Sequence, residues 1–253
     1  YDYEVVHYTR EYFNSYPDNI MAVRLSADQA GKISFDTNLE NLINGTAYTN
    51  TVDGDTITMR DALSTNGLNV EAQLKVINEG GSLSTGTNGG NPAITVSGAD
   101  AVTLIFACGT DYKMELPNFR GEDPHKAVTA RIDAAAKKGY EALKADHIAD
   151  HSALFSRVEL GFDEEIPQIP TDELIKKYRN MIENNGGDIP TSAEQRALEI
   201  MCYQFGRYLT IAGSRDGASD KSSGCLGRRM VHMVWRLSFQ YQCSDELLAN
   251  NGK

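Results

Sequence analysis

The spacing of the apolar residues changes once along this chain, at Pro124. Before that residue, apolar and polar side chains alternate in short runs, as in KISFDTNLE, where Ile33 and Phe35 alternate with Ser34 and Asp36. A period of two is typical of half-buried β-strands. After Pro124, apolar residues recur every three to four positions, which is the period of an amphipathic helix. Strands followed by helices predict an α+β chain in two units.

The first half reads as several short strands separated by turn dipeptides. The strand-like runs are IMAVRLSA, KISFDTNLE, TITMRDA, LNVEAQLKVI and AVTLIFACGTDY. The turn dipeptides are Asn44-Gly45, Asp53-Gly54, Asn66-Gly67, Gly80-Gly81 and Ser97-Gly98. Short strands at this spacing predict an antiparallel β-sandwich over residues 1–118. Residues 80–92, GGSLSTGTNGGNP, are expected to form an exposed loop.

The second half predicts four helical stretches. In the first, Val128, Ile132 and Ala135 share one face, and after Gly139 a second face carries Leu143, His147, His151 and Phe155. A short helix is predicted in TDELIKKYRNMIEN. The last helix begins at a capping box, Thr191 followed by Glu194. Its predicted apolar face is Leu198, Met201, Cys202, Phe205, Leu209 and Ala212.

Composition excludes several functional classes. The net charge of −11 over 253 residues argues against a nucleic-acid surface, since phosphate binding needs clustered basic side chains. Four widely spaced cysteines form no C-x-x-C pair, so we expect neither a metal cluster nor a disulfide framework. No apolar run approaches the roughly 20 residues that span a bilayer. We expect no metal, no cofactor and no membrane partner; the cellular location stays open, because the chain opens at Tyr1 rather than Met.

His147 and His151 lie four residues apart on a predicted helix, a spacing that zinc proteases use. That motif needs Glu directly after the first His, and Ile148 stands there instead. Asp146 and Asp150 precede the two histidines, so the pattern is better explained by local pairing on a solvated helix face.

Three other patterns are weak as sites. Asp163, Glu164 and Glu165 are adjacent in sequence, whereas glycosidase carboxylates come from different elements, so a solvated loop is expected. The GTNGGN stretch lacks the strand-to-helix context of a phosphate-binding loop. Aromatic residues crowd the N-terminus and could stack on sugars, although sheet packing is the commoner role for aromatics in strands. They are Tyr1, Tyr3, Tyr8, Tyr12, Phe13 and Tyr16.

Three longer segments, in this order, resemble glycoside hydrolase family 95. YTREYFNSYPDNIMAVRLSADQAGKISF (residues 8–35) is similar to a strand pair of that family's N-terminal sandwich. HIADHSALFSRVEL (residues 147–160) is similar to its linker helix, and YQFGRYLTIAGSRDG (residues 203–217) to its first barrel helix. The family contains mainly α-L-fucosidases and some α-L-galactosidases, built from a β-sandwich, a helical linker and a catalytic (α/α)6 barrel.

The resemblance implies a domain plan. Residues 1–118 would be a partial sandwich whose first strands are missing, residues 119–188 the linker, and residues 189–217 the first barrel helix. Residues 218–253 do not fit the family pattern. However, WRLSFQYQCSDELLA (residues 235–249) can be encoded so that a reading one nucleotide later gives HFNINVQMNYWP, a barrel motif of the family. We therefore expect the chain after about Gly217 to be translated out of frame.

The resemblance also implies an inverting mechanism on fucosylated glycans. A glutamic acid would protonate the leaving oxygen, while asparagines backed by an aspartate hold the attacking water. None of these groups maps onto this chain, so no catalytic residue is assigned, the substrate-binding residues are unknown, and the chain itself is expected to be inactive. A fragment of a glycoside phosphorylase or an α-L-galactosidase, and a separate carbohydrate-binding sandwich, remain alternatives. Sugar and linkage specificity, secretion and oligomeric state are left open.

Overall fold

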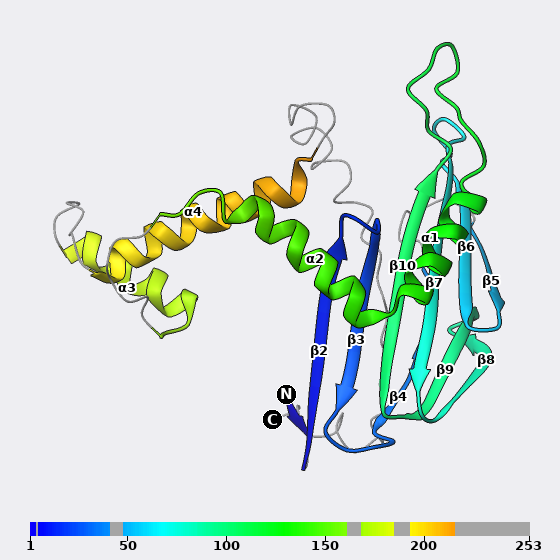
Figure 1. Ribbon diagram of the computed structural model, residues 1–253, viewed down its shortest axis with the longest axis horizontal. Helices are drawn as coiled ribbons and strands as arrows, with labels where there is room; N and C mark the ends of the chain where they lie inside the picture. The colour runs from blue at the N-terminus through cyan, green and yellow to red at the C-terminus, as the bar shows by residue number, and fades with distance from the viewer. Residues whose placement is uncertain (4, 41–47, 161–167, 185–192, 216–253) are drawn as a thin grey trace. The chain divides into compact units, whose positions relative to one another are not determined.

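The computed structural model of the protein describes residues 1–3, 5–40, 48–160, 168–184 and 193–215, and for residues 193–196 the backbone alone. Ten strands precede four helices in this part of the chain (Figure 1). The strands are β1 (Asp2–Tyr3), β2 (Val6–Ser15), β3 (Ile20–Ala27), β4 (Ile33–Thr37), β5 (Thr49–Asp53), β6 (Thr56–Ala62), β7 (Asn69–Glu79), β8 (Ser82–Asn88), β9 (Asn91–Ala99) and β10 (Ala101–Thr110). The helices are α1 (His125–Lys138), α2 (Tyr140–Phe155), α3 (Thr171–Asn184) and α4 (Ala193–Gly213). The predicted order, strands and then helices, is confirmed.

The strands form two antiparallel sheets that face each other as a sandwich. The larger sheet has the order β1-β2-β3-β10-β7-β6-β5, and the smaller one has the order β4-β9-β8. The long pairing of β10 with β7 runs from Ala101 opposite Glu79 to Thr110 opposite Val70. Consecutive strands are often neighbours, whereas β10 returns to lie between β3 and β7. The predicted antiparallel sandwich is therefore confirmed.

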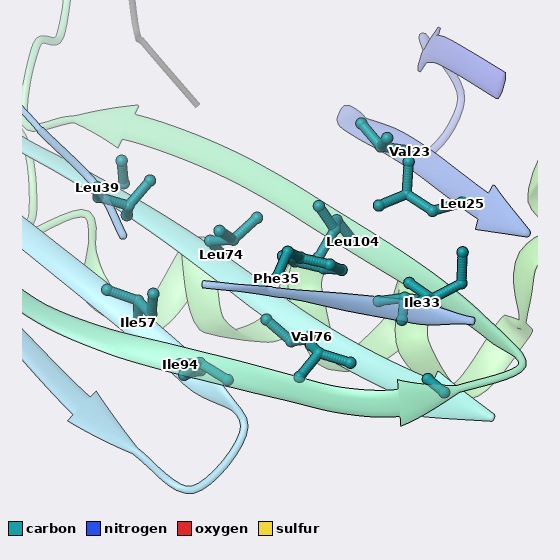
Figure 2. Packing of buried hydrophobic residues seen from close by; sticks show 14 of the residues in the cluster. Val23, Leu25, Ile33, Phe35, Leu39, Ile57, Leu74, Val76, Ile94 and Leu104 are labelled. Atoms are coloured by element: carbon teal, nitrogen blue, oxygen red, sulfur yellow. The ribbon is translucent and has the colours of Figure 1, made fainter. Parts of the chain in front are cut away.

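Apolar side chains from both sheets fill the space between them (Figure 2). Ile33 and Phe35 point inward from β4, as their alternation with polar residues predicts. The buried residues of this sandwich core are Val23, Leu25, Ile33, Phe35, Leu39, Ile57, Met59, Ala72, Leu74, Val76, Ile94, Val96, Ala99, Val102 and Leu104. Because each fully buried large aliphatic side chain contributes about 1.5–3 kcal/mol, this core is the main source of stability for the sandwich.

The opposite face of the larger sheet is covered by α1. Val128, Ile132 and Ala135 are buried there, so the predicted apolar face of this helix is confirmed. They form a second core with Leu143 of α2 and with four strand residues, Ile20, Ala22, Ile105 and Ala107. The central strands of this sheet are therefore buried on both faces (Figure 1).

Two predictions in the strand half were wrong. Residues 80–92 are not a loop, because Ser82–Asn88 form β8, which pairs with β9 along its whole length. Its serines, threonines and glycine carry no apolar alternation, since an edge strand needs only backbone hydrogen bonds. Ser97-Gly98 is not a turn between strands but lies inside β9, where the register with β4 shifts. Gly98 has a φ of 62°, which suits a β-bulge.

The described residues divide into two compact units. Tyr1–Ile148 belong to the first, and the second begins at Ala149. Within the second unit α3 packs against α4. Leu198 is buried, whereas Phe205 and Leu209 on the predicted apolar face of α4 are 60% and 52% exposed. Of the described helices, none is long and apolar enough to cross a membrane.

Candidate functional site

The two histidines of the H-x-x-x-H pattern lie on α2, and aromatic rings stack on both. His147 stacks on Phe13 with ring centroids 5.0 Å apart, and His151 stacks on Phe155 at 5.5 Å. A third ring, that of Tyr208, lies 5.6 Å from His151. The described residues contain no group of three or more His, Cys, Asp or Glu side chains that could hold a metal ion. Both imidazole rings therefore pack against aromatic rings.

The aspartates that precede these histidines bind basic side chains from other segments, and the expected local pairing with the histidines stays a prediction. Asp146 binds Lys138 of α1 at 2.5 Å, and Asp150 binds Arg215. Lys138 also donates to Asp18, and its hydrogen bonds to Asp146 and Asp18 raise the pKa of its ammonium group. Each carboxylate forms an ion pair with a lysine or arginine outside α2. A hydrogen bond between two charged groups is stronger than one to a neutral imidazole.

In the second unit, the end of α2 and the end of α4 run antiparallel and are joined by side chains. Arg215 binds Asp150 with both nitrogens, at 3.3 Å from Nη1 to Oδ1 and 2.5 Å from Nη2 to Oδ2. Arg207 donates to the Phe155 carbonyl, and its guanidinium carbon lies 4.5 Å above the Phe155 ring. We call these contacts, together with the ring contact of His151 and Tyr208, the α2–α4 junction.

The α2–α4 junction brings together two of the three segments that resemble family 95. Asp150 and Phe155 come from residues 147–160, and Arg207 and Arg215 from residues 203–217. A forked guanidinium suits a carboxylate or carbonyl better than an ammonium does, because its donors are planar and fixed. Both arginines bind protein acceptors, so the described contacts give the junction a structural role. Nε2 of His151 is buried there without a hydrogen-bond partner.

A second polar cluster lies in the first unit, beneath the N-terminus of α1. Glu71 is fully buried on β7, and its Oε1 lies 2.8 Å from Nδ1 of His125 and 2.7 Å from the Gln73 amide nitrogen. The Gln73 amide nitrogen also donates to Oγ1 of Thr129 on α1 at 2.8 Å. Nε of Arg60 lies 3.3 Å from Oε2 of Glu71.

Sequence reasoning missed this Glu71 cluster. Glu71 and Gln73 lie on the side of β7 opposite its apolar residues, and the strand-like pattern alone does not predict that α1 covers that side. The apolar face of α1 was the feature of the sequence from which this cluster could have been predicted, because that face must pack against another apolar surface. Asp123 adds to the cluster: its pKa is lowered by the hydrogen bond from the backbone N–H of His125 and by the Arg60 side chain. The arrangement fastens α1 to the sheet.

The N-terminal aromatic residues do not form one surface, because alternation divides them between the two faces of β2. Tyr8 packs on the sandwich core and stacks on Tyr1 at 5.2 Å. Phe13 points the other way and contacts Tyr140 of α2. Tyr12 is 52% exposed. Sheet packing therefore explains Tyr8 and Phe13, as expected.

The remaining candidates from the sequence either form no phosphate-binding geometry or lie outside the residues that the structure describes. The GTNGGN stretch forms the end of β8 and its turn into β9, with no helix beside the glycines. Asp163, Glu164, Glu165, Thr191 and residues 216–253 lie outside the described residues. The expectation that no catalytic residue is present, and the offset reading of the tail, stay predictions.

Comparison with known proteins gives two family matches. Residues 1–115 match "Glycosyl hydrolase family 65, N-terminal domain", and residues 139–239 match "Glycosyl hydrolase family 95 catalytic domain". The protein named Probable alpha-fucosidase A of Aspergillus niger is 30% identical over 252 residues, which is 96% of this chain and 30% of that protein. Alpha-L-fucosidase 2 of Arabidopsis thaliana is 26% identical over 259 residues, 93% of this chain and 30% of that protein.

A solved structure, "Putative kojibiose phosphorylase from human microbiome", is similar with a TM-score of 0.39 and 10% identity, covering 58% of this chain and 21% of that one. The chain thus spans about 30% of the length of the curated relatives. Both family matches fit the order observed here, a sandwich followed by helices. Residues 139–239 are therefore similar to the catalytic domain of glycoside hydrolase family 95, and residues 1–115 to an N-terminal domain of the family 65 type.

Proposed function

We propose that this chain is part of an inverting glycoside hydrolase that cleaves α-L-fucosides from glycans. The observation that carries the proposal is the match of residues 139–239 to the family 95 catalytic domain. Two relatives whose names include fucosidase align with more than nine-tenths of the chain, which supports the same substrate class. Because the chain spans about 30% of each relative, we place the general acid and the groups that hold the water elsewhere in a longer protein.

The proposal is tested with two samples: the 253-residue chain and the product of the longest open reading frame that contains it. We expect the longer product to release 4-nitrophenol from 4-nitrophenyl α-L-fucoside and the 253-residue chain to release none. The α-L-galactoside is the control for sugar specificity. An inverting enzyme gives the β-anomer of fucose first, which NMR detects. Activity of the longer product on neither glycoside would refute the substrate class.

A glycoside phosphorylase is the second candidate, because the N-terminal match is to a family 65 domain. In that reaction, inorganic phosphate attacks the anomeric carbon in place of water, and a sugar phosphate is formed. Phosphate dependence separates the two candidates. Turnover that requires phosphate and yields sugar phosphate would favour the phosphorylase, and turnover in phosphate-free buffer would favour the hydrolase.

We also propose that the sequence after about Gly217 is read in a shifted frame. The support is the offset reading of residues 235–249, which recovers a barrel motif of the family. The match to the family 95 model continues past Gly217 to residue 239, so the coding sequence is the deciding observation. Codons that do not permit HFNINVQMNYWP one nucleotide later would disprove the frameshift without affecting the match to the family 95 catalytic domain.

A further inference from the structure

Five Asn-Gly pairs occur in the sequence, and two of them, Asn66-Gly67 and Asn88-Gly89, lie in the described residues. Asn-Gly is chemically labile. The backbone nitrogen of the glycine can attack Cγ of the asparagine, forming a C–N bond and expelling the side-chain nitrogen as ammonia. Water then opens the resulting five-membered imide to give aspartate or isoaspartate, with no oxidant or reductant. Glycine permits the attack because it has no Cβ to block the approach.

The first pair, Asn66-Gly67, is held in a geometry that opposes this reaction. The attacking nitrogen would be that of Gly67, whose N–H donates to the Leu63 carbonyl at 2.6 Å. The side-chain oxygen of Asn66 accepts from the backbone N–H of Leu68 at 3.0 Å, so the amide group is turned into the loop. The Asn66 carbonyl also accepts a hydrogen bond from Arg120. Both reacting groups must break hydrogen bonds before they can meet.

The second pair, Asn88-Gly89, has neither restraint. Asn88 pairs with Asn91 at the end of the β8–β9 hairpin, which leaves Gly89 and Gly90 as the two exposed residues of the turn. Their φ angles of 60° and 85° are typical of glycine at a hairpin tip. In such a turn the first central N–H takes no part in the ladder. Among the described residues, none accepts a hydrogen bond from the Gly89 N–H.

We propose that Asn88 is a site of spontaneous deamidation and isomerisation in this protein, and that the fold protects Asn66. Conversion to aspartate adds a negative charge to a chain that already carries −11. Conversion to isoaspartate inserts an extra carbon into the backbone where the hairpin closes. The buried Asn38, whose Nδ2 lies 3.4 Å from the Asn88 carbonyl oxygen, lies beside the altered bond. The edge of the smaller sheet would be the part of the sandwich that changes with age.

The test incubates the full 253-residue chain in mildly alkaline buffer made with ¹⁸O water, followed by peptide mapping with mass spectrometry. We expect Asn88 to convert about tenfold faster than Asn66, which corresponds to the roughly 1.4 kcal/mol in barrier that one hydrogen bond supplies. Incorporation of ¹⁸O identifies opening of the imide by water. Equal rates in the folded chain, or faster conversion of Asn66, would overturn the proposal.

Two controls separate the fold from the local sequence. In concentrated urea both pairs lose their hydrogen bonds, so their rates should converge; a tenfold difference that persists in urea would show that the fold is not its cause. Asn91 precedes Pro92, which has no N–H to attack with, so it should stay unmodified in the same peptide. The variant Asn88→Gln should abolish the signal at this position, and a signal that remains would contradict the assignment.

Discussion

The two units differ in how they hold their apolar side chains. In the first, the larger sheet is covered by the smaller sheet on one face and by α1 on the other, and both contacts are built from fully buried aliphatic residues. In the second, α4 is joined to the end of α2 by Arg207 and Arg215, while Phe205 and Leu209 stay more than half exposed. Burial of many aliphatic side chains therefore stabilises the sandwich. In the second unit, directional side-chain contacts join α4 to the end of α2, and α3 packs on α4, with Leu174 of α3 and Leu198 of α4 buried.

This difference concerns how completely each unit buries its own apolar side chains. Exposed aromatic and aliphatic side chains along one helix are typical of a surface that packs against another element. The apolar face predicted from the sequence for α4, which includes Phe205 and Leu209, likewise indicates a surface that packs against another element. We expect the second unit to open more readily than the first, since local stability follows the number of buried apolar contacts.

The largest effect is expected from the sandwich core. Phe35→Ala removes a side chain that is 4% exposed and leaves a cavity, which should lower the free energy of unfolding by about 3–5 kcal/mol. Phe205→Ala on α4 is the matched control; because that ring is 60% exposed, the change should stay within about 0.5 kcal/mol. Urea unfolding followed by circular dichroism measures both. Equal losses would contradict the proposed contrast between the two units.

The next effect is expected at the Glu71 cluster. Glu71→Gln keeps the shape but removes the charge that His125 and Arg60 face, and we expect a loss of about 1–3 kcal/mol. Glu79→Gln serves as the control on the same strand, where the bond to Arg24 lies at a partly exposed site and should contribute about 1 kcal/mol or less. The same unfolding experiment applies. A larger loss at Glu79 than at Glu71 would show that α1 is not fastened through the buried carboxylate.

A smaller, local effect is expected at the α2–α4 junction. Arg207→Ala removes both the hydrogen bond to the Phe155 carbonyl and the contact with its ring, worth about 1–2 kcal/mol together. Hydrogen exchange of the α4 amides should accelerate by roughly tenfold, with the strands unaffected. Arg179→Ala, on the exposed side of α3, should leave α4 unchanged. If exchange in α4 is the same in both variants, Arg207 does not hold the helix.

The smallest effect concerns pH. Hydrogen bonds from Lys144 and from Tyr140 hold the pKa of Glu11 below its ordinary value of 4.5. A lowered pKa in the folded state means that the pair stabilises the protein above pH 4.5, and that this contribution is lost as the pH falls through the folded-state pKa. Glu11→Gln should therefore lower the melting temperature slightly at neutral pH and flatten its fall below pH 4.5. Because the carboxylate is partly exposed, solvent screening keeps the change small.

The same pairing affects Tyr140. Burial, followed by the hydrogen bond to Glu11, raises the pKa of its phenol. The phenol therefore stays protonated and continues to donate to Glu11 throughout the range in which Glu11 itself titrates. The acid limb of the stability curve thus reports on the carboxylate and not on the tyrosine.

The sequence predicts strands and helices that have one apolar and one polar face. It does not predict elements that lack this contrast. Ile33 and Phe35 identified β4 because their neighbours are polar. β8 was missed because only Leu83 packs against the core, so backbone pairing alone defines that strand. The pairing of Asp150 with Arg215, 65 residues apart, is not visible locally, since either histidine beside the aspartate is a plausible partner until the helices are placed.

The burial of β7 on both faces determines which fragments of this protein can keep a complete core. A polypeptide that stopped at residue 118 would keep all the strands that the structure describes, yet Ile105 and Ala107 would face water and Glu71 would lose its contact with His125. The second core is complete only in a fragment that extends through Leu143. Helix α1 and the start of α2 are therefore part of the folded sandwich domain.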